Sequence, residues 1–246
     1  MDRILLVIPC FKERRRLPGF LDTLCPAIEA SGLPIDLLAV DDGSGREEAQ
    51  FLNALIERHQ QRWAFVHPAL LLERNRGKGG AVYAGWDHAE DTNRWLAFVD
   101  ADGAISANEI IRVLNIVFAG AASDTEQRSW FGVRTGADGT KVDRTPLRRL
   151  TGRVFALMVR ILFKMPVPDT QCGFKIVPRS WFGSCRRNLI EERFCFDIEM
   201  AYWLQRQGIS ITSIPISWKE TAGSHLGLKH VLQMFASVLV LRRRLD

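Results

Sequence analysis

The stretch "WLAFVDADGAIS", residues 95 to 106, joins a short apolar run to two aspartates, Asp100 and Asp102, and then to a glycine. An apolar run of this kind is typical of a strand buried on both faces of a sheet. Two carboxylates about 4 Å apart would repel by roughly 4 kcal/mol at an effective dielectric constant of about 20. The stretch therefore predicts a buried strand whose end needs a cation between two acidic side chains.

The segments around this stretch alternate between short apolar runs and longer periodic segments. Strands are predicted at residues 4–8, 35–40, 95–99 and 129–133. Helices are predicted at residues 17–31, 46–62, 77–91 and 106–119. Such alternation is typical of an α/β fold with a parallel sheet flanked by helices, in which ligands bind beyond the carboxyl ends of the strands.

Length and composition limit the class of protein. With 246 residues, of which 47% are hydrophobic, the chain can bury one substantial core, and we expect one domain over residues 1–225 with a C-terminal amphipathic helix over 226–246. The net charge of +5 is modest, and the chain lacks RNA-type aromatic and zinc-finger motifs, so we expect no nucleic-acid partner. Five cysteines without a CxxC pair favour reduced thiols. The apolar runs are too short for a signal peptide or a membrane span.

One polar motif follows the predicted strand at 35–40, and another lies at the start of the predicted helix at 77–91. "VDDGSG", residues 40–45, fits a turn with Ser44 as a helix cap, or a pair of aspartates, Asp41 and Asp42, that accept hydrogen bonds from a nucleoside. "RNRGKGGAVYAG", residues 74–85, fits either a tight turn with an exposed Lys78 or a phosphate site at the start of a helix. It matches neither the P-loop nor the dinucleotide fingerprint.

The "DADG" motif at 100–103 favours a divalent cation. An EF-hand calcium loop is excluded because Ile105 and Ile111 occupy the positions that require glycine and glutamate. One or two carboxylates combined with phosphate oxygens are typical ligands of Mg²⁺ or Mn²⁺. The alternative is a solvated loop without a metal.

Two segments predict contact with a surface. Residues 146–164 form a basic amphipathic helix, whose cations are Arg149, Arg153, Arg160 and Lys164. The C-terminal segment has an apolar run at 231–241 that is followed by three arginines. Both fit a membrane surface with anionic lipids. The alternatives are a solvated helix face for the first, and a docking helix or homodimer contact for the second.

Seven motifs, taken together and in order, resemble family 2 glycosyltransferases of the GT-A fold. They are "IPCFKE", "VDDGSG", "RNRGKGGAV", "FVDADG", "DTQCGFK", "FCFDIEM" and "WKETAGSHL". Within that family the sequence is most similar to the dolichyl-phosphate β-glucosyltransferases and related polyprenyl-phosphate sugar synthases. The resemblance implies a mixed, mostly parallel sheet and a metal-dependent enzyme.

The resemblance also implies roles for individual residues. Those that would bind the nucleotide sugar are Pro9, Glu13, Asp41, Asp42, Lys78, Asp100, Ala101, Asp102 and Gln171. Asp100 and Asp102 would hold Mg²⁺ or Mn²⁺, and they, Arg134 and Asp197 would be catalytic. Arg134, Arg149 and Arg153 would receive the phosphate of the acceptor.

The resemblance implies transfer of a hexose, with inversion, from a nucleotide sugar to an acceptor. We expect glucose from UDP-glucose and a polyprenyl or dolichyl phosphate at the cytoplasmic face of a membrane. A lipid phosphate is already anionic and needs no base, whereas a sugar hydroxyl would need one, for which Asp197 is the candidate. The alternatives are extension of a glycan through a hydroxyl, a nucleotidyltransferase, and a membrane-associated binding module without turnover.

Overall fold

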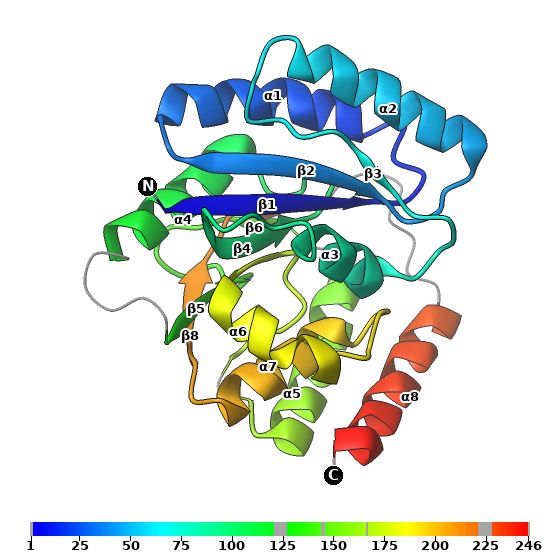
Figure 1. Cartoon of the computed structure of the whole chain (residues 1–246). Coiled ribbons are helices and arrows are strands. Elements are labelled where there is room, and N and C mark those ends of the chain that lie inside the picture. Colours follow the sequence, from blue (N-terminus) through cyan, green and yellow to red (C-terminus); the bar gives the residue numbers. More distant parts are fainter. Residues whose placement is uncertain (1, 121–126, 144–145, 166, 221–227, 246) are drawn as a thin grey trace.

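A computed structural model describes residues 2–120, 127–143, 146–165, 167–220 and 228–245. Within these residues a seven-stranded sheet has the order β3-β2-β1-β4-β7-β5-β8 (Figure 1). Its strands are β1 (Arg3–Cys10), β2 (Ile35–Asp41), β3 (Leu70–Leu71), β4 (Asn93–Val99), β5 (Arg128–Val133), β7 (Phe174–Pro178) and β8 (Ser210–Pro215). Two shorter strands, β6 (Val142–Asp143) and β9 (Trp218–Lys219), pair with each other beside it.

Helices cover both faces of the sheet. One layer consists of α1 (Leu17–Ser31), α2 (Arg46–Gln60) and α4 (Ala107–Gly120). The other layer consists of α3 (Lys78–Trp86), α5 (Pro146–Phe163), α6 (Arg179–Cys185), α7 (Phe196–Arg206) and α8 (Leu228–Leu245), with a short 3-10 turn at Arg186–Asn188. In the described part of the chain, no helix is long and apolar enough to cross a bilayer.

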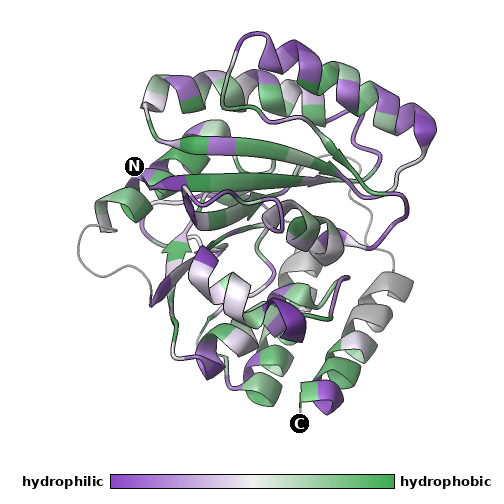
Figure 2. Ribbon diagram, in the orientation of Figure 1, coloured by the Kyte–Doolittle hydropathy of each residue, from purple (hydrophilic) through white to green (hydrophobic). Residues whose placement is uncertain are grey.

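The alternation of side chains along β1 explains the two layers. Ile4, Leu6 and Ile8 pack into the layer of α1, α2 and α4, whereas Leu5 and Val7 pack into the layer of α3 and α5–α8. Full burial of one such side chain contributes roughly 1.5–3 kcal/mol, so a strand that is apolar on both faces belongs in the centre of the sheet. Figure 2 shows β1 and β2 as hydrophobic along most of their length.

The direction of the strands brings several segments to one edge of the sheet. β1, β2 and β4 are parallel, whereas β7 runs antiparallel to both β4 and β5. Val99, the last residue of β4, therefore pairs with Phe174, the first residue of β7. The predicted mixed, mostly parallel sheet is confirmed, as are the four predicted strands and four predicted helices.

Candidate functional site

Most of the predicted donor-binding residues line one cavity, at the edge of the sheet where β1, β2 and β4 end. The first cavity has a volume of about 530 Å³. Its lining includes the predicted residues Pro9, Glu13, Asp42, Lys78, Asp100, Ala101 and Asp102, together with Cys10, Phe11, Arg16, Asn75, Gly77, Arg193 and Phe194. Because β1, β2 and β4 end side by side, residues more than 90 positions apart in the sequence share this cavity.

A second cavity of about 500 Å³ holds the predicted acceptor-side residues. Its lining is Arg134, Thr135, Gly136, Val142, Gly152, Arg153, Phe155, Ala156, Pro168, Asp169, Thr170 and Gln171. Gln171 therefore lies in the second cavity, although it was predicted to contact the donor sugar. The side chain of Arg149 lies outside the described residues, as do residues 221–226 of the motif "WKETAGSHL" at 218–226.

The two aspartates of "DADG" differ in their contacts. Asp100 forms an ion pair with Lys78, whose Nζ lies 2.5 Å from Oδ1. Asp102 Oδ1 accepts a hydrogen bond of 2.9 Å from the backbone N–H of Ala104, which orders the turn after β4. Burial works to lower the pKa of Lys78, but the carboxylates of Asp100 and Asp197 outweigh it and raise that pKa. Lys78 is thus a firmly charged cation at the carboxyl end of β4.

Asp100 is also held from the side of β7. Its backbone N–H donates to Gly173 O over 3.0 Å. A Cβ atom on Gly173 would lie less than 3.0 Å from all three atoms of the Asp100 carboxyl group. The glycine of "DTQCGFK" therefore leaves room for the Asp100 side chain, a role that sequence reasoning did not identify.

The carboxylates of Asp41 and Asp42 accept hydrogen bonds from other residues of the protein. The Asp42 carboxylate accepts hydrogen bonds from Asn75 Nδ2 at 2.9 Å and from the backbone N–H groups of Arg76 at 2.7 Å and Gly77 at 2.9 Å. Burial raises the pKa of Asp42, and the two backbone donors oppose that rise. Asp41 Oδ2 accepts from Ser44 N–H at 2.9 Å. The two aspartates order the loops around the first cavity, and nucleoside binding by them stays a prediction.

Ser44 does not cap the helix that follows it. Gly45 is the N-terminal cap of α2 and makes no side-chain hydrogen bond there. Ser44 Oγ instead accepts from the backbone N–H of Lys12 at 2.9 Å, which ties the loop after β2 to the loop after β1. The helix-cap interpretation of Ser44 was therefore wrong.

The glycines of "RNRGKGG" permit close packing with a distant segment. A Cβ on Gly77 would lie 2.6 Å from Glu192 O, and a Cβ on Gly79 would lie 2.5 Å from Phe196 Cβ. Residues 192–196 thus cover the first turn of α3, and this packing explains why glycine is needed there. Phosphate binding at the same helix start stays a prediction, with Lys78 as a cation at that helix start that lines the first cavity.

Glu13 and Arg16 form a bidentate pair at the wall of the first cavity. Arg16 Nε and Nη2 donate to the two carboxylate oxygens of Glu13 over 2.8 Å and 2.5 Å. Burial raises the pKa of Glu13, against the effect of Arg16. Sequence reasoning named Glu13 and missed Arg16, which lies three residues later at the N-terminal cap of α1.

Asp197 is paired with a lysine that sequence reasoning missed. Lys175 Nζ lies 2.6 Å from Asp197 Oδ1 and donates to Cys172 O over 2.6 Å. Lys175 is completely buried in β7 and lies against the rings of Phe98 and Phe131 on the two neighbouring strands. Burial raises the pKa of Asp197, and the lysines oppose the rise. Asp197 lines neither cavity.

Arg134 is fixed by an aspartate at the second cavity. Its Nε and Nη2 donate to Asp169 Oδ2 and Oδ1 over 2.7 Å and 2.9 Å. Burial would lower the pKa of Arg134, but the Asp169 carboxylate outweighs it and raises that pKa. The guanidinium also lies 5.6 Å from the centre of the Trp218 ring. A bidentate pair holds the planar guanidinium of Arg134 in one orientation at the second cavity, and binding of an acceptor phosphate by it stays a prediction.

The acidic side chains of the first cavity fit a hard divalent cation. In the described part of the chain, no group of three or more His, Cys, Asp or Glu side chains is arranged to hold a metal ion. Asp100 and Asp102, which both line the first cavity, stay the predicted carboxylate ligands of such a cation. This donor set fits Mg²⁺ or Mn²⁺, which take few protein ligands, and does not fit zinc, which takes at least three.

Known proteins resemble this chain over nearly its whole length. It is 29% identical to a dolichyl-phosphate β-glucosyltransferase of Dictyostelium discoideum, with 99% of this chain and 76% of that protein covered. It is also 29% identical to the dolichyl-phosphate β-glucosyltransferase of Saccharomyces cerevisiae, with 91% of this chain and 69% of that protein covered.

A solved GT-A structure has the same fold. It is the Mycobacterium tuberculosis glucosyl-3-phosphoglycerate synthase with Mn²⁺, UDP and glucosyl-3-phosphoglycerate, which matches with a TM-score of 0.67 and 15% identity, over 98% of this chain and 80% of that one. Residues 5–182 match the sequence model of the family described as Glycosyl transferase family 2. The chain belongs to glycosyltransferase family 2 and is a glycosyltransferase of the GT-A fold.

Proposed function

We propose that this glycosyltransferase moves a hexose, glucose from UDP-glucose, to a polyprenyl or dolichyl phosphate with the help of Mg²⁺ or Mn²⁺. The names of the relatives support the lipid-phosphate acceptor. The observation that carries the proposal is the pair of neighbouring cavities, one with two aspartates and Lys78, the other with Arg134 held by Asp169.

The donor would bind in the first cavity. Lys78 would lie beside its diphosphate, with Pro9 and Glu13 on the side of the nucleoside. When bound, a metal on Asp100 and Asp102 would neutralise negative charge on the leaving diphosphate. Arg16 keeps Glu13 in place, and Lys78 remains protonated because its neighbours raise its pKa.

The acceptor phosphate would bind in the second cavity at Arg134 and Arg153. One of its oxygens attacks the anomeric carbon of the hexose as the bond from that carbon to the nucleoside diphosphate breaks. The diphosphate leaves with the bonding electron pair, and the product is a hexosyl lipid phosphate. An anionic phosphate oxygen needs no proton removed, so no general base is required.

The burial of Asp197 disfavours the alternative of a hydroxyl acceptor. A general base must come within hydrogen-bonding reach of the proton it removes. Asp197 is only 4% exposed, is paired with Lys175 and lines neither cavity. We therefore assign Asp197 to the support of Lys175 and Lys78, and we prefer the phosphate acceptor.

The outer face of α5 supports a position at a membrane surface. Phe155, Val159 and Phe163 of this helix are buried. Four other aliphatic residues share its outer face and are between 49% and 67% exposed: Leu150, Val154, Leu157 and Ile161. We call these four residues the α5 stripe. The exposed cations Arg153 and Arg160 lie on the same helix, and the exposed Lys164 follows its last residue.

Such a face suits the headgroup region of a bilayer. Apolar side chains would enter the acyl boundary while cations beside them meet lipid phosphates. On α8, Leu239 and Val240 are also exposed, while Val238 and Leu241 are buried. The ring of Phe235 on α8 packs edge-to-face on that of Phe155 at 5.6 Å, so the two helices are neighbours. We therefore propose peripheral association through α5 and α8.

One assay tests donor, acceptor and metal together. The purified chain is incubated with radiolabelled UDP-glucose, polyprenyl phosphate and Mn²⁺, and butanol-soluble label is counted, with EDTA and a glycan hydroxyl acceptor as parallel reactions. We expect label in the lipid fraction that is lost with EDTA and in Asp102→Asn, and kept in the control Asp138→Asn in an exposed loop outside both cavities. Label in the glycan alone would refute the lipid acceptor.

A further inference from the structure

Residues 189–195, here called the 189–195 loop, separate the two cavities. Arg193 and Phe194 of this loop line the first cavity. Phe194 O accepts a hydrogen bond of 3.4 Å from Nε2 of Gln171, which lines the second cavity. The position of this loop therefore affects the shape of the first cavity and its boundary with the second.

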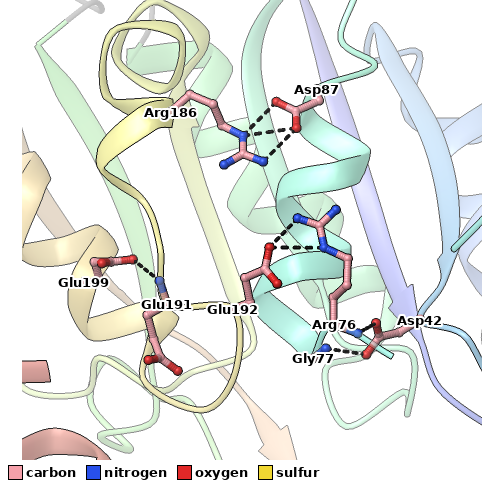
Figure 3. Close-up of polar contacts among 8 residues, drawn as sticks. All are labelled: Asp42, Arg76, Gly77, Asp87, Arg186, Glu191, Glu192 and Glu199. Carbon is pink, nitrogen blue, oxygen red and sulfur yellow. Dashed lines mark hydrogen bonds and ion pairs between the residues drawn. The ribbon is translucent and has the colours of Figure 1, made fainter. Parts of the chain in front are cut away.

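Glu192 ties the loop to the start of α3. Its Oε1 accepts hydrogen bonds from Nε of Arg76 at 3.1 Å and from Nη2 of the same guanidinium (Figure 3). Its backbone O accepts from Gly80 N–H at 3.0 Å. Gly77 and Gly79 let the loop approach this closely.

The backbone of Arg76 is held in turn by Asp42, a residue that lines the first cavity. Its backbone N–H and that of Gly77 donate to the carboxylate of Asp42, as Figure 3 shows. Asp42, Gly77, Arg193 and Phe194 all line the first cavity. The contacts therefore run from Asp42 through Arg76 and Glu192 to the loop that forms another part of the lining.

A second anchor holds the loop from the protein interior. The fully buried Glu199 on α7 accepts a hydrogen bond of 2.8 Å from Glu191 N–H (Figure 3). Glu191 is thus anchored to α7 and Glu192 to α3, and both anchors restrict the movement of the loop. Loss of the Arg76 contact would leave residues 192–194 attached through backbone contacts and Glu191.

We propose that Glu192 is a positioning residue for the donor: its ion pair with Arg76 holds Arg193 and Phe194 in place as a wall of the first cavity. This inference rests on the proposed function, because it takes the donor to be a nucleotide sugar bound there. Side chains of Arg76 and Glu192 are 30% and 34% exposed. A pair this exposed contributes little to folding, so its effect should be on binding.

The other end of α3 offers a matched control. Arg186 and Asp87 form a bidentate ion pair there, with side chains 30% and 43% exposed (Figure 3). Neither residue lines the first or the second cavity. Asp87→Asn therefore removes a comparable ion pair from the same helix without touching the donor wall.

The experiment compares wild type, Glu192→Gln, Arg76→Gln, the double variant and Asp87→Asn. Calorimetry measures the Kd of UDP-glucose with Mn²⁺, turnover assays separate KM for the donor from kcat, and hydrogen exchange reports on residues 189–195. We expect the first two variants each to weaken donor binding by about tenfold, the double variant to add little to either, and kcat at saturating donor to change by less than about twofold.

The outcomes separate this inference from the proposed function. Faster exchange in residues 189–195 with weaker donor binding in Glu192→Gln, both absent in Asp87→Asn, would support the positioning role. Wild-type binding of UDP-glucose with an equal Kd in Glu192→Gln would overturn it. A wild-type protein that binds no nucleotide sugar would instead refute the proposed function and the donor assignment on which the inference depends.

Discussion

Replacing Gly173 by alanine should weaken metal binding by displacing Asp100. The added Cβ would lie less than 3.0 Å from every atom of the Asp100 carboxyl group, closer than side chains tolerate. The neighbouring strands cannot easily separate, because Asp100 N–H donates to Gly173 O at 3.0 Å. The carboxylate must therefore move by about 1 Å, several times the tolerance of about 0.2 Å for a metal–ligand distance.

The expected loss follows from this displacement. Disturbing the support of a metal ligand typically costs about 10- to 100-fold in affinity, and we expect a loss in that range for Mn²⁺ in the presence of UDP. Titration of Mn²⁺ followed by electron paramagnetic resonance measures it without any turnover. Gly183→Ala is the matched control, because a Cβ on that glycine of α6 meets nothing within 4 Å.

Thermal unfolding without metal distinguishes a loss of Mn²⁺ affinity from a loss of the fold. The Gly173→Ala protein should show a cooperative thermal transition, because the clash falls on a side chain at the edge of the sheet. Mn²⁺ affinity within about twofold of wild type in a folded Gly173→Ala protein would show that Asp100 either does not bind the metal or does not depend on Gly173 for its position.

Three further predictions follow from buried charge and from the α5 stripe. Burial raises the pKa of Glu199 to about 7 from its ordinary 4.5, so the folded protein holds this proton more tightly than the unfolded chain, and stability falls as pH rises between those values. Glu199→Gln should remove about 2–3 kcal/mol of that fall between pH 5 and 8 in urea unfolding, and parallel pH profiles for the two proteins would contradict this. Lys175→Met should cost about 3–5 kcal/mol by leaving Asp197 buried and unpaired, and adding Asp197→Asn should restore much of it; no recovery in the double variant would count against the pair. Leu157→Asp should lower flotation with vesicles rich in anionic lipid, whereas Ile116→Asp, an exposed site on α4 in the other layer, should not, and equal flotation of both would exclude the α5 stripe as the contact.

The first half of the fold could be predicted because its signals are local. The cores of β1, β2 and β4 are apolar on both faces, and a turn-rich polar cluster follows each of them. β7 was not predicted, and its sequence explains why. It is short and carries Lys175 in the middle of the sheet, where a charge is retained only because Asp197 and the carbonyl of Cys172 receive it. Those partners cannot be read from the pattern of the strand.

For the candidate site, too, the residues with local signals could be predicted and their distant partners could not. Asp100, Asp102, Lys78, Pro9 and Glu13 lie at the ends of strands, shortly after them, or at the start of a helix, and the structure brings all of them to the first cavity. The contacts that position them depend on distant segments. Arg76 and Glu192, for example, are 116 positions apart, and no local pattern marks such a pair.

The reversed direction of β7 brings a connection from a later part of the chain to the edge of the sheet where β4 ends. An antiparallel strand enters the sheet at the edge where its parallel neighbours leave it. The connection that precedes β7 therefore delivers Asp169 and Gln171 to the second cavity, next to a first cavity built mainly by the loops after β1, β2 and β4. Under the proposed function, we therefore expect that exchange of this connection up to Cys172 between related enzymes changes the acceptor, whereas Gly173 must be kept because it leaves room for Asp100 in the first cavity.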